Sequence, residues 1–140
     1  MSEAVRFRFD VDGSDFSSAG AASVTVKKKL RQLGYSPDVI RKVSIAMYEG
    51  EINMVIHANG GVAEVEVSDE EITIILADRG PGIPNVELAM QEGYSTAREN
   101  IRNLGFGAGM GLPNMKKYTD SLDIDTVVGE GTTITMKVKL

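Results

Sequence analysis

Glu49 and Asn53 are the pair of polar side chains whose spacing first suggests chemistry. They stand four residues apart in a segment with a helical pattern, and His57 follows one turn later, so all three share one face of the expected helix. The amide oxygen of Asn is a hard ligand suited to Mg²⁺, and a carboxylate can orient or deprotonate an attacking hydroxyl. An ordinary surface pair would show the same spacing, so the pair alone identifies no function.

The segment after an almost continuously apolar strand is a second candidate site. Its residues are Asp78, Arg79, Gly80, Pro81, Gly82, Ile83 and Pro84. An aspartate at the end of a buried strand is costly unless its carboxylate accepts hydrogen bonds, and the amino group of adenine is a suitable donor. Gly80 and Gly82 would let the backbone pass close to a flat base, which Ile83 could cover. Because Asp, Gly and Pro all favour turns, a plain turn is the alternative interpretation.

A glycine-rich segment that leads into a short helix is a third candidate. It consists of Gly105, Phe106, Gly107, Ala108, Gly109, Met110, Gly111 and Leu112. Backbone amides at a helix N-terminus bind phosphate, and glycines permit the close approach that this needs. The segment is not a Walker A loop, since no Gly-Lys-Ser/Thr follows, and its spacing does not fit a Rossmann fingerprint. A flexible loop is the alternative.

The helix that would carry the first pair has clear start and stop signals. Ser36 is a suitable N-cap, Pro37 suits the first helical position, and the pattern ends near Ala58. One apolar stripe along it should face the core, formed by Ile40, Val43, Met47, Gly50 and Met54. Gly50 costs about 1 kcal/mol relative to Ala in a helix, and close packing against a neighbouring element would offset that cost.

Alternation and apolar runs predict five strands, at residues 5–11, 62–68, 71–78, 121–127 and 132–139. Helices are predicted at residues 16–33, 36–58, 85–91 and 112–119. The long irregular stretch between the third strand and the last helix is typical of a functional lid. This order predicts one α+β domain over residues 1–140: a two-layer sandwich with a mixed, mostly antiparallel sheet and helices on one face.

Composition excludes several classes of function. The chain has 140 residues, a net charge of −5 and no basic block beyond Lys27–Lys29, which argues against a nucleic-acid binder. It has no cysteine, so disulfides and thiolate metal sites are excluded. No apolar run approaches the roughly 20 residues of a membrane span, and the N-terminus has no signal-peptide pattern. A cytoplasmic protein without membrane or nucleic-acid partners is therefore expected.

Taken together and in this order, the motifs resemble those of the GHKL ATPase and kinase superfamily, which has the Bergerat fold. Glu49-x-x-x-Asn53 looks like its N box, and Asp78-x-Gly80-x-Gly82 looks like its G1 box. Gly107-x-Gly109-Met110-Gly111-Leu112 looks like the G2 box, and Gly131-Thr132-Thr133 is similar to the closing Gly-Thr motif. The match covers roughly residues 36–140.

The resemblance implies roles for these residues around ATP and Mg²⁺. Asp78 would accept from the adenine amino group, Asn53 would ligate Mg²⁺, and Glu49 would act as the catalytic base. Thr133 would help to hold the adenine end. The remaining nucleotide contacts would come from Gly80, Gly82, Ile83, Gly105, Gly107, Ala108, Gly109, Met110, Gly111 and Leu112. Residues 85–110 would form the ATP lid.

A stand-alone domain of this size resembles the bacterial anti-sigma factors and switch-type serine kinases. The resemblance implies a Mg-ATP-dependent serine/threonine protein kinase whose substrate is a small STAS-domain (anti-anti-sigma type) protein in transcriptional or stress signalling. The alternative is an ATP-gated regulator that sequesters a sigma factor or a phosphatase, with little or no kinase activity. A slow ATPase would share the same base chemistry. Relatives often dimerise, so the resemblance also allows a homodimer.

The sequence departs from the family pattern in two places. Gly50-Glu51 replaces the more usual apolar or small pair inside the N box, which puts a second carboxylate beside the expected base. The stretch Ala97–Leu104 lengthens the lid relative to the shortest switch kinases. Arg98 or Arg102 in it could reach the γ-phosphate, as a lid cation would, or each could be a solvated charge.

Overall fold

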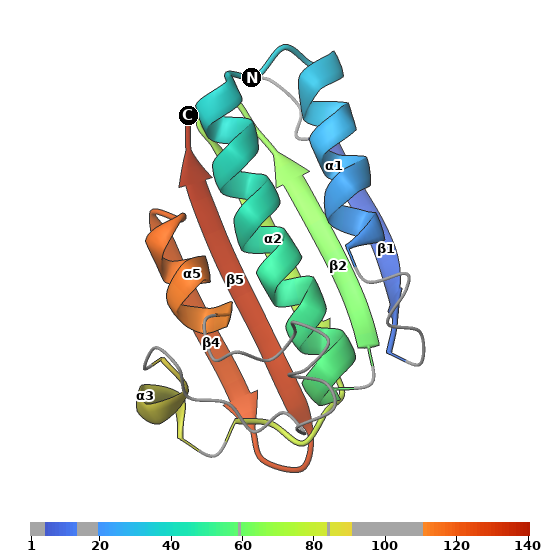
Figure 1. Cartoon of the computed structure of the whole chain (residues 1–140), viewed down its shortest axis with the longest axis vertical. Helices are drawn as coiled ribbons and strands as arrows, with labels where there is room; N and C mark the ends of the chain where they lie inside the picture. The colour runs from blue at the N-terminus through green and yellow to red at the C-terminus, as the bar shows by residue number, and fades with distance from the viewer. Residues whose placement is uncertain (1–4, 14–19, 59, 84, 91–110) are drawn as a thin grey trace, which may run out of the picture.

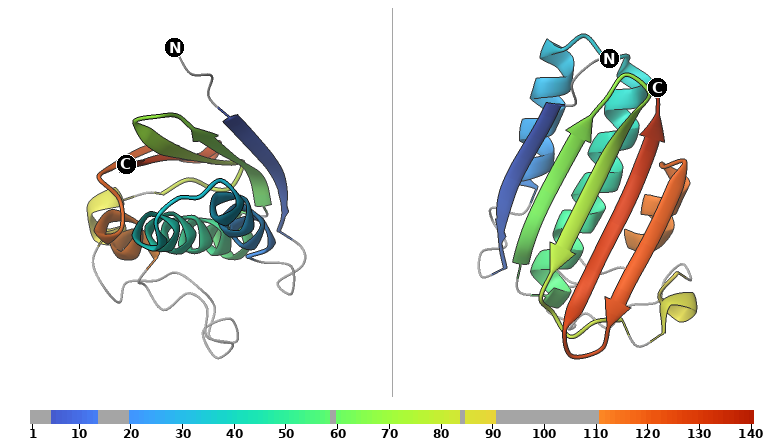
Figure 2. Two further views of the ribbon diagram at one scale, coloured as in Figure 1. Left: turned by 90° about the horizontal axis from the view of Figure 1, so that it is seen from above. Right: turned by 180° about the vertical axis from the view of Figure 1, so that it is seen from behind.

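The computed structural model describes residues 5–13, 20–58, 60–83, 85–90 and 111–140. Five strands form one sheet, and the helices α1, α2 and α5 cover one of its faces (Figures 1 and 2). The elements are β1 Val5–Asp12, α1 Ala21–Gln32, α2 Pro37–Ala58, β2 Gly60–Val67, β3 Glu71–Asp78, α3 Val86–Ala89, α5 Gly111–Lys117, β4 Ser121–Val127 and β5 Gly131–Lys139. The predicted α+β two-layer arrangement is therefore confirmed.

The sheet has the strand order β1-β2-β3-β5-β4, and each of these four strand pairs is antiparallel. The expectation of a mixed sheet is wrong in this respect. β4 runs in the same direction as β3, but it lies at the edge of the sheet. Its hairpin partner β5 is inserted between them and is antiparallel to both. The long connection before α5 gives the chain enough length to place β4 at that edge.

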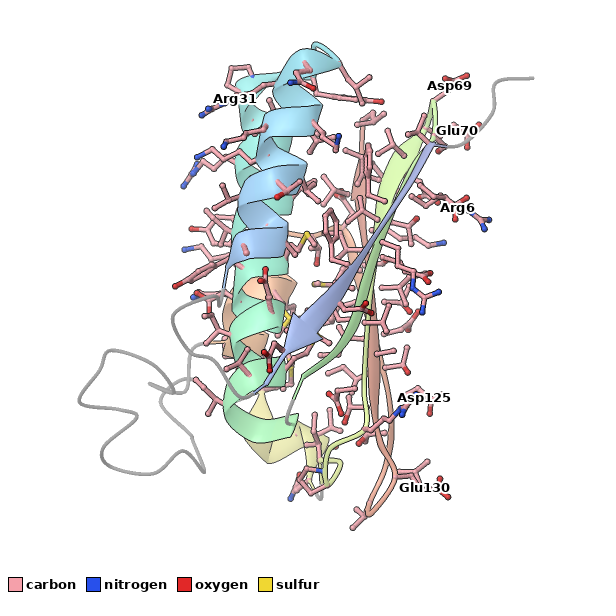
Figure 3. All side chains as sticks on the ribbon, turned by 90° about the vertical axis from the view of Figure 1, so that its right-hand side faces the viewer. Arg6, Arg31, Asp69, Glu70, Asp125 and Glu130 are labelled. Carbon is pink, nitrogen blue, oxygen red and sulfur yellow. The ribbon has the colours of Figure 1, made fainter. Side chains whose placement is uncertain are left out.

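Alternation along the strands places the core between the sheet and the helices. In β3, Ile72, Ile74 and Leu76 are almost completely buried, whereas the residues between them face the opposite side and are only half-buried. Charged residues such as Arg6 and Asp125 lie on the face away from the helices (Figure 3). The sheet therefore has one packed and one solvated face, which is usual for antiparallel sheets.

Helix α2 lies between α1 and α5 and carries the predicted apolar stripe into the core (Figure 1). The N–H of Val39 donates to Oγ of Ser36 at 3.2 Å, which confirms the predicted N-cap. Every residue of the stripe is buried, including Gly50. A Cβ at Gly50 would overlap Cδ1 of Leu76 and come within 3.3 Å of Sδ of Met115. Gly50 therefore allows α2 to approach both β3 and α5 closely, as predicted.

Gly50→Ala is expected to destabilise the fold, although alanine is the better helix former. The intrinsic gain is about 1 kcal/mol, whereas overpacking a well-filled core typically costs about 1–3 kcal/mol. Leu76 is only 1% exposed, so any shift of its side chain away from the new methyl group must be taken up within a packed core. Urea unfolding of Gly50→Ala, of Leu76→Ala and of the double variant measures the coupling. We expect the Gly50 change to cost less when Leu76 is truncated; an equal cost in both backgrounds would contradict the close packing.

Helix α1 is shorter than predicted within the described residues. It begins at Ala21, after Gly20 with φ +95°, and residues 16–19 of the expected helix lie outside the described part. Between β3 and α5 the structure describes one short helix, α3, and residues 91–110 are not described. In the described part of the chain, no helix is both long and apolar enough to cross a membrane.

Candidate functional site

The candidate residues meet at the end of the molecule where α2 and β3 finish and α5 begins (Figure 1). The turn between β4 and β5 lies at the same end. Glu49 and Asn53 come from α2, Asp78 from the last position of β3, and Gly111 from the first position of α5. The side chains of Glu49, Asn53 and Asp78 and the turn as far as Ile83 are thus described, and the third motif is described from Gly111 onward.

Asp78 is half-buried and uses one carboxylate oxygen to order the local backbone. Its Oδ1 accepts from the N–H of Gly80 at 2.9 Å and from the N–H of Thr132 at 3.1 Å. Within the residues that the structure describes, these are the hydrogen bonds to this carboxylate. Oδ2 is left to accept from another donor, which fits recognition of an exocyclic amino group.

The turn that follows β3 is tied to the β4–β5 hairpin. The N–H of Ile83 donates to Oγ1 of Thr126 at 2.8 Å, and Ile83 packs partly against the core. Gly82 has φ +80°, and a Cβ there would come within 2.7 Å of the carbonyl oxygen of Val127. Only glycine fits this close approach without strain. The hairpin therefore fixes the shape of the turn that was predicted to face the base.

The structure does not bring Thr133 to the same side of the sheet as Asp78. Thr133 pairs with Ala77 and Asp125, and their side chains lie on the face away from the helices, where Figure 3 shows Asp125. The preceding residue, Thr132, is 5% exposed and lies on the helix-facing side. The threonine beside Asp78 is therefore Thr132, because one residue along a strand changes the face. The role of Thr133 at the adenine end stays a prediction, and this placement does not favour it.

Asn53 lies directly against the first residue of α5. A Cβ at Gly111 would come within 2.8 Å of Nδ2 and 2.9 Å of Oδ1 of Asn53. Leu112, which is 6% exposed, anchors the start of α5 in the core. The Asn53 amide therefore stands where the glycine-rich segment enters its helix, and the absence of a side chain at Gly111 leaves space for it.

Glu49 is half-buried and faces the first turns of α5. The side-chain Nδ2 of Asn114 donates to its Oε1 at 3.4 Å. Burial raises the pKa of Glu49 above its ordinary value of 4.5, and the hydrogen bond from Asn114 partly opposes this shift. A carboxylate with a raised pKa is a better proton acceptor near neutral pH than an ordinary exposed one. Sequence reasoning missed Asn114, since no motif marks it.

Glu49→Gln is expected to make the fold more stable at about pH 7 but not at about pH 3. Because the folded-state pKa of Glu49 is raised, its stabilising contribution is complete below the unfolded-state pKa and is lost as pH rises through the folded-state pKa. Gln has no charge to bury and keeps an oxygen for the Asn114 donor. Urea midpoints at both pH values measure the difference, and a variant less stable than wild type at neutral pH would oppose this account.

The second carboxylate of this part of α2, that of Glu51, does not lie beside Glu49. Glu51 is 2% exposed and accepts hydrogen bonds from backbone N–H groups at the start of α1. Two residues along a helix correspond to a rotation of about 200°, so Glu51 points away from Glu49. That spacing was the sequence signal that could have shown the separation.

The residues present fit a magnesium nucleotide better than a metal held by protein alone. Within the described residues, no group of three or more His, Cys, Asp or Glu side chains could hold a metal ion. Mg²⁺ in nucleotide sites is typically bound by one or two protein oxygens, with phosphates and water completing the shell. Asn53 would be that ligand here. Of His57 the structure describes the helical backbone but not the side chain.

Several predicted contacts lie outside the described residues. They are Arg98, Arg102, Gly105, Gly107, Ala108, Gly109 and Met110. The expected lid at residues 85–110 is described only as far as Met90, and this part includes α3. The phosphate-binding role of the glycine-rich segment therefore stays a prediction.

Two known proteins are similar to this chain over most of its length. An anti-sigma F factor of Clostridium beijerinckii is 34% identical over 124 residues, which cover 84% of this chain and 83% of that protein. The serine/threonine-protein kinase RsbT of Bacillus subtilis is 32% identical over 108 residues, covering 74% of this chain and 75% of that protein.

A solved structure shows the same fold. The crystal structure of the RsbU and RsbW domains of Rv1364c from Mycobacterium tuberculosis matches with a TM-score of 0.67 at 17% identity, covering 97% of this chain and 32% of that longer chain. Residues 14–138 also match the family described as the histidine kinase-like ATPase domain, a description that implies ATP binding. With relatives above 30% identity over most of its length, the chain belongs to the histidine kinase-like ATPase domain family.

Proposed function

We propose that the protein is a Mg-ATP-dependent serine/threonine protein kinase that regulates a small STAS-domain partner in bacterial transcriptional or stress signalling. The observation that carries this proposal is Glu49: a half-buried carboxylate with a raised pKa, on the same helix face as Asn53 and held by Asn114. The match to a histidine kinase-like ATPase domain and the likeness to RsbT support it. Such a regulator would act in the cytoplasm.

Each side chain has a separate task in this proposal. Oδ2 of Asp78 accepts from the adenine amino group, and the turn at Gly82 and Ile83 forms one wall for the base. Asn53 offers its amide oxygen to Mg²⁺. Mg-ATP, when bound, would supply the γ-phosphoryl group, and its Mg²⁺ would offset part of the phosphate charge. Glu49 would take the proton from the acceptor hydroxyl while the hydroxyl oxygen bonds to the γ-phosphorus of ATP, and the bond between that phosphorus and the β,γ-bridging oxygen would break to release ADP.

Transfer of label from [γ-³²P]ATP to a STAS-domain protein tests the proposal. We expect label on a serine or threonine of the partner, dependent on Mg²⁺ and on this protein. Release of all label as inorganic phosphate, with an unlabelled partner, would indicate an ATPase. No consumption of ATP with any STAS protein would reject the kinase.

An ATP-gated anti-sigma regulator is the second candidate, because several relatives are named anti-sigma F factors. In that case the nucleotide changes affinity for a sigma factor or phosphatase without chemistry. Binding to such a partner would be measured with apo, ADP-bound and ATP-bound Glu49→Ala protein. A nucleotide-dependent affinity in this variant supports sequestration, whereas equal affinities in all three states oppose it.

A further inference from the structure

Glu51 is a buried carboxylate that the proposed chemistry does not use. Its Oε2 accepts from the N–H groups of Gly20 at 2.8 Å and Ala22 at 3.2 Å, and its Oε1 accepts from the N–H of Ser23 at 3.0 Å. At 2% exposure, this carboxylate is compensated by three backbone donors of a different helix. A charge buried in this way is costly unless it is hydrogen-bonded, so each of these contacts matters.

These donors are the amides of the N-cap residue Gly20 and of two residues in the first turn of α1, a helix that has no side-chain cap from its own N-cap residue. The N-cap position is Gly20, whose φ of +95° suits glycine and which makes no side-chain cap hydrogen bond. Glu51 therefore replaces the missing Ser, Thr or Asp, and its negative charge suits the positive end of the α1 dipole. Tyr48 also contacts this point, since a Cβ at Gly20 would come within 2.9 Å of Cε1 of its ring.

The anchor and the candidate site lie on opposite sides of α2. At about 100° per residue, Glu51 is rotated about 200° from both Glu49 and Asn53. Figure 1 shows the same arrangement at the level of helices, with α1 on one side of α2 and α5 on the other. Any rotation of α2 about its axis would break the Glu51 contacts and would move Glu49 and Asn53 relative to α5.

We propose that Glu51 is a positioning residue for the site. By holding α2 to the start of α1, it fixes the rotation of α2 and so places Glu49 against Asn114 and Asn53 against Gly111. The geometric part of this proposal needs no nucleotide. Its consequence for Mg²⁺ binding rests on the proposed function.

Glu51→Gln tests the geometric part with little change in volume. Gln offers one acceptor oxygen, and its NH₂ group must face an N–H donor, so at least one of the three hydrogen bonds is lost. The side-chain amide NMR signals of Asn53 and Asn114 report the two contacts on the far side of α2. We expect both signals to shift in Glu51→Gln.

Ser23→Ala is the matched control. It removes the hydrogen bond from Oγ of Ser23 to the carbonyl oxygen of Gly20 and weakens the same turn of α1, but it leaves in place the three backbone N–H donors to Glu51. We expect it to lower the melting temperature without shifting either amide signal. Unchanged amide signals in a folded Glu51→Gln protein, or equal shifts in both variants, would overturn the positioning role. If Glu51→Gln does not fold, Tyr48→Ala weakens the same anchor from its exposed side and must shift the same signals.

The affinity for ADP, measured with and without Mg²⁺, is a second way to distinguish a positioning role of Glu51 from a general loss of stability. The ratio of ADP dissociation constants without and with Mg²⁺ is expected to fall at least five-fold in Glu51→Gln and to stay unchanged in Ser23→Ala. Affinity for Mg²⁺-free ADP should stay within two-fold, since Asp78 is held by β3 and β5. Failure of wild type to bind ADP would count against the proposed function alone, because the amide signals still decide the role of Glu51.

Discussion

Asp78→Asn is expected to lower the affinity for ATP about 100-fold while leaving the protein folded. The amide keeps an oxygen in the place of Oδ1, so the hydrogen bonds from the N–H groups of Gly80 and Thr132 can persist. It replaces Oδ2 by an NH₂ group, which would face the amino group of adenine. A lost hydrogen bond to a charged group is worth about 1.5–3 kcal/mol, and every 1.4 kcal/mol is tenfold in affinity.

Calorimetric titration with Mg-ATP measures this loss, and Asp125→Asn is the matched control. The Asp125→Asn substitution makes the same chemical change, a carboxylate replaced by an uncharged amide, but Asp125 lies on the outer face of the sheet (Figure 3). We expect Asp125→Asn to bind like wild type. ATP binding by Asp78→Asn as tight as by wild type would exclude Asp78 as the acceptor for adenine and would reopen the orientation of the nucleotide.

Glu49→Ala is expected to reduce phosphoryl transfer about 10²- to 10⁴-fold, the range for removal of a positioned general base. ATP affinity should change little, because adenine recognition lies at Asp78, on a different element. Single-turnover transfer to the partner at saturating ATP measures the chemical step without product release. Transfer at the wild-type rate by Glu49→Ala would show that this carboxylate is not the base.

Asn114→Ala is the informative companion to this variant. In the wild type, the hydrogen bond from the Asn114 amide lowers the pKa of Glu49, so the loss of this amide should raise that pKa further. The base is active when deprotonated, and the acid limb of the rate profile should therefore move to higher pH in Asn114→Ala. A profile that keeps its position in this variant would mean that Glu49 does not control the acid limb.

The parts of the fold that depend on local pattern could be predicted from the sequence. The cap at Ser36, the buried stripe of α2 and the strand that ends at Asp78 all follow from periodicity and from a few residues with strong preferences. The close contact at Gly50 was also predictable, since a helix interior rarely tolerates glycine without a packing reason. The signal for each of these features lies in neighbouring residues of the sequence, although Leu76 and Met115, the partners of Gly50, are distant and could not be named from it.

Features that depend on partners distant in sequence could not be predicted. The all-antiparallel sheet arises because β5 lies between β3 and β4, and no local pattern encodes that order. The choice between Thr132 and Thr133 needs the register of β5, because one residue reverses the face. In the sequence, Glu51 is only one more acidic residue, because nothing near it shows that the start of α1 lies against it. The nucleotide and metal roles of all these residues stay predictions.

The hydrogen bond from the N–H of Thr132 to Asp78 can form only late in the synthesis of this protein by the ribosome. The donor is synthesised 54 residues after the acceptor. An emerging chain can assemble β1, α1, α2, β2 and β3 early, since these elements contact one another. Its aspartate, however, stays without its interstrand donor until β5 has left the exit tunnel. We therefore expect ATP to stabilise the completed chain and to give no help to nascent chains that stop before β5.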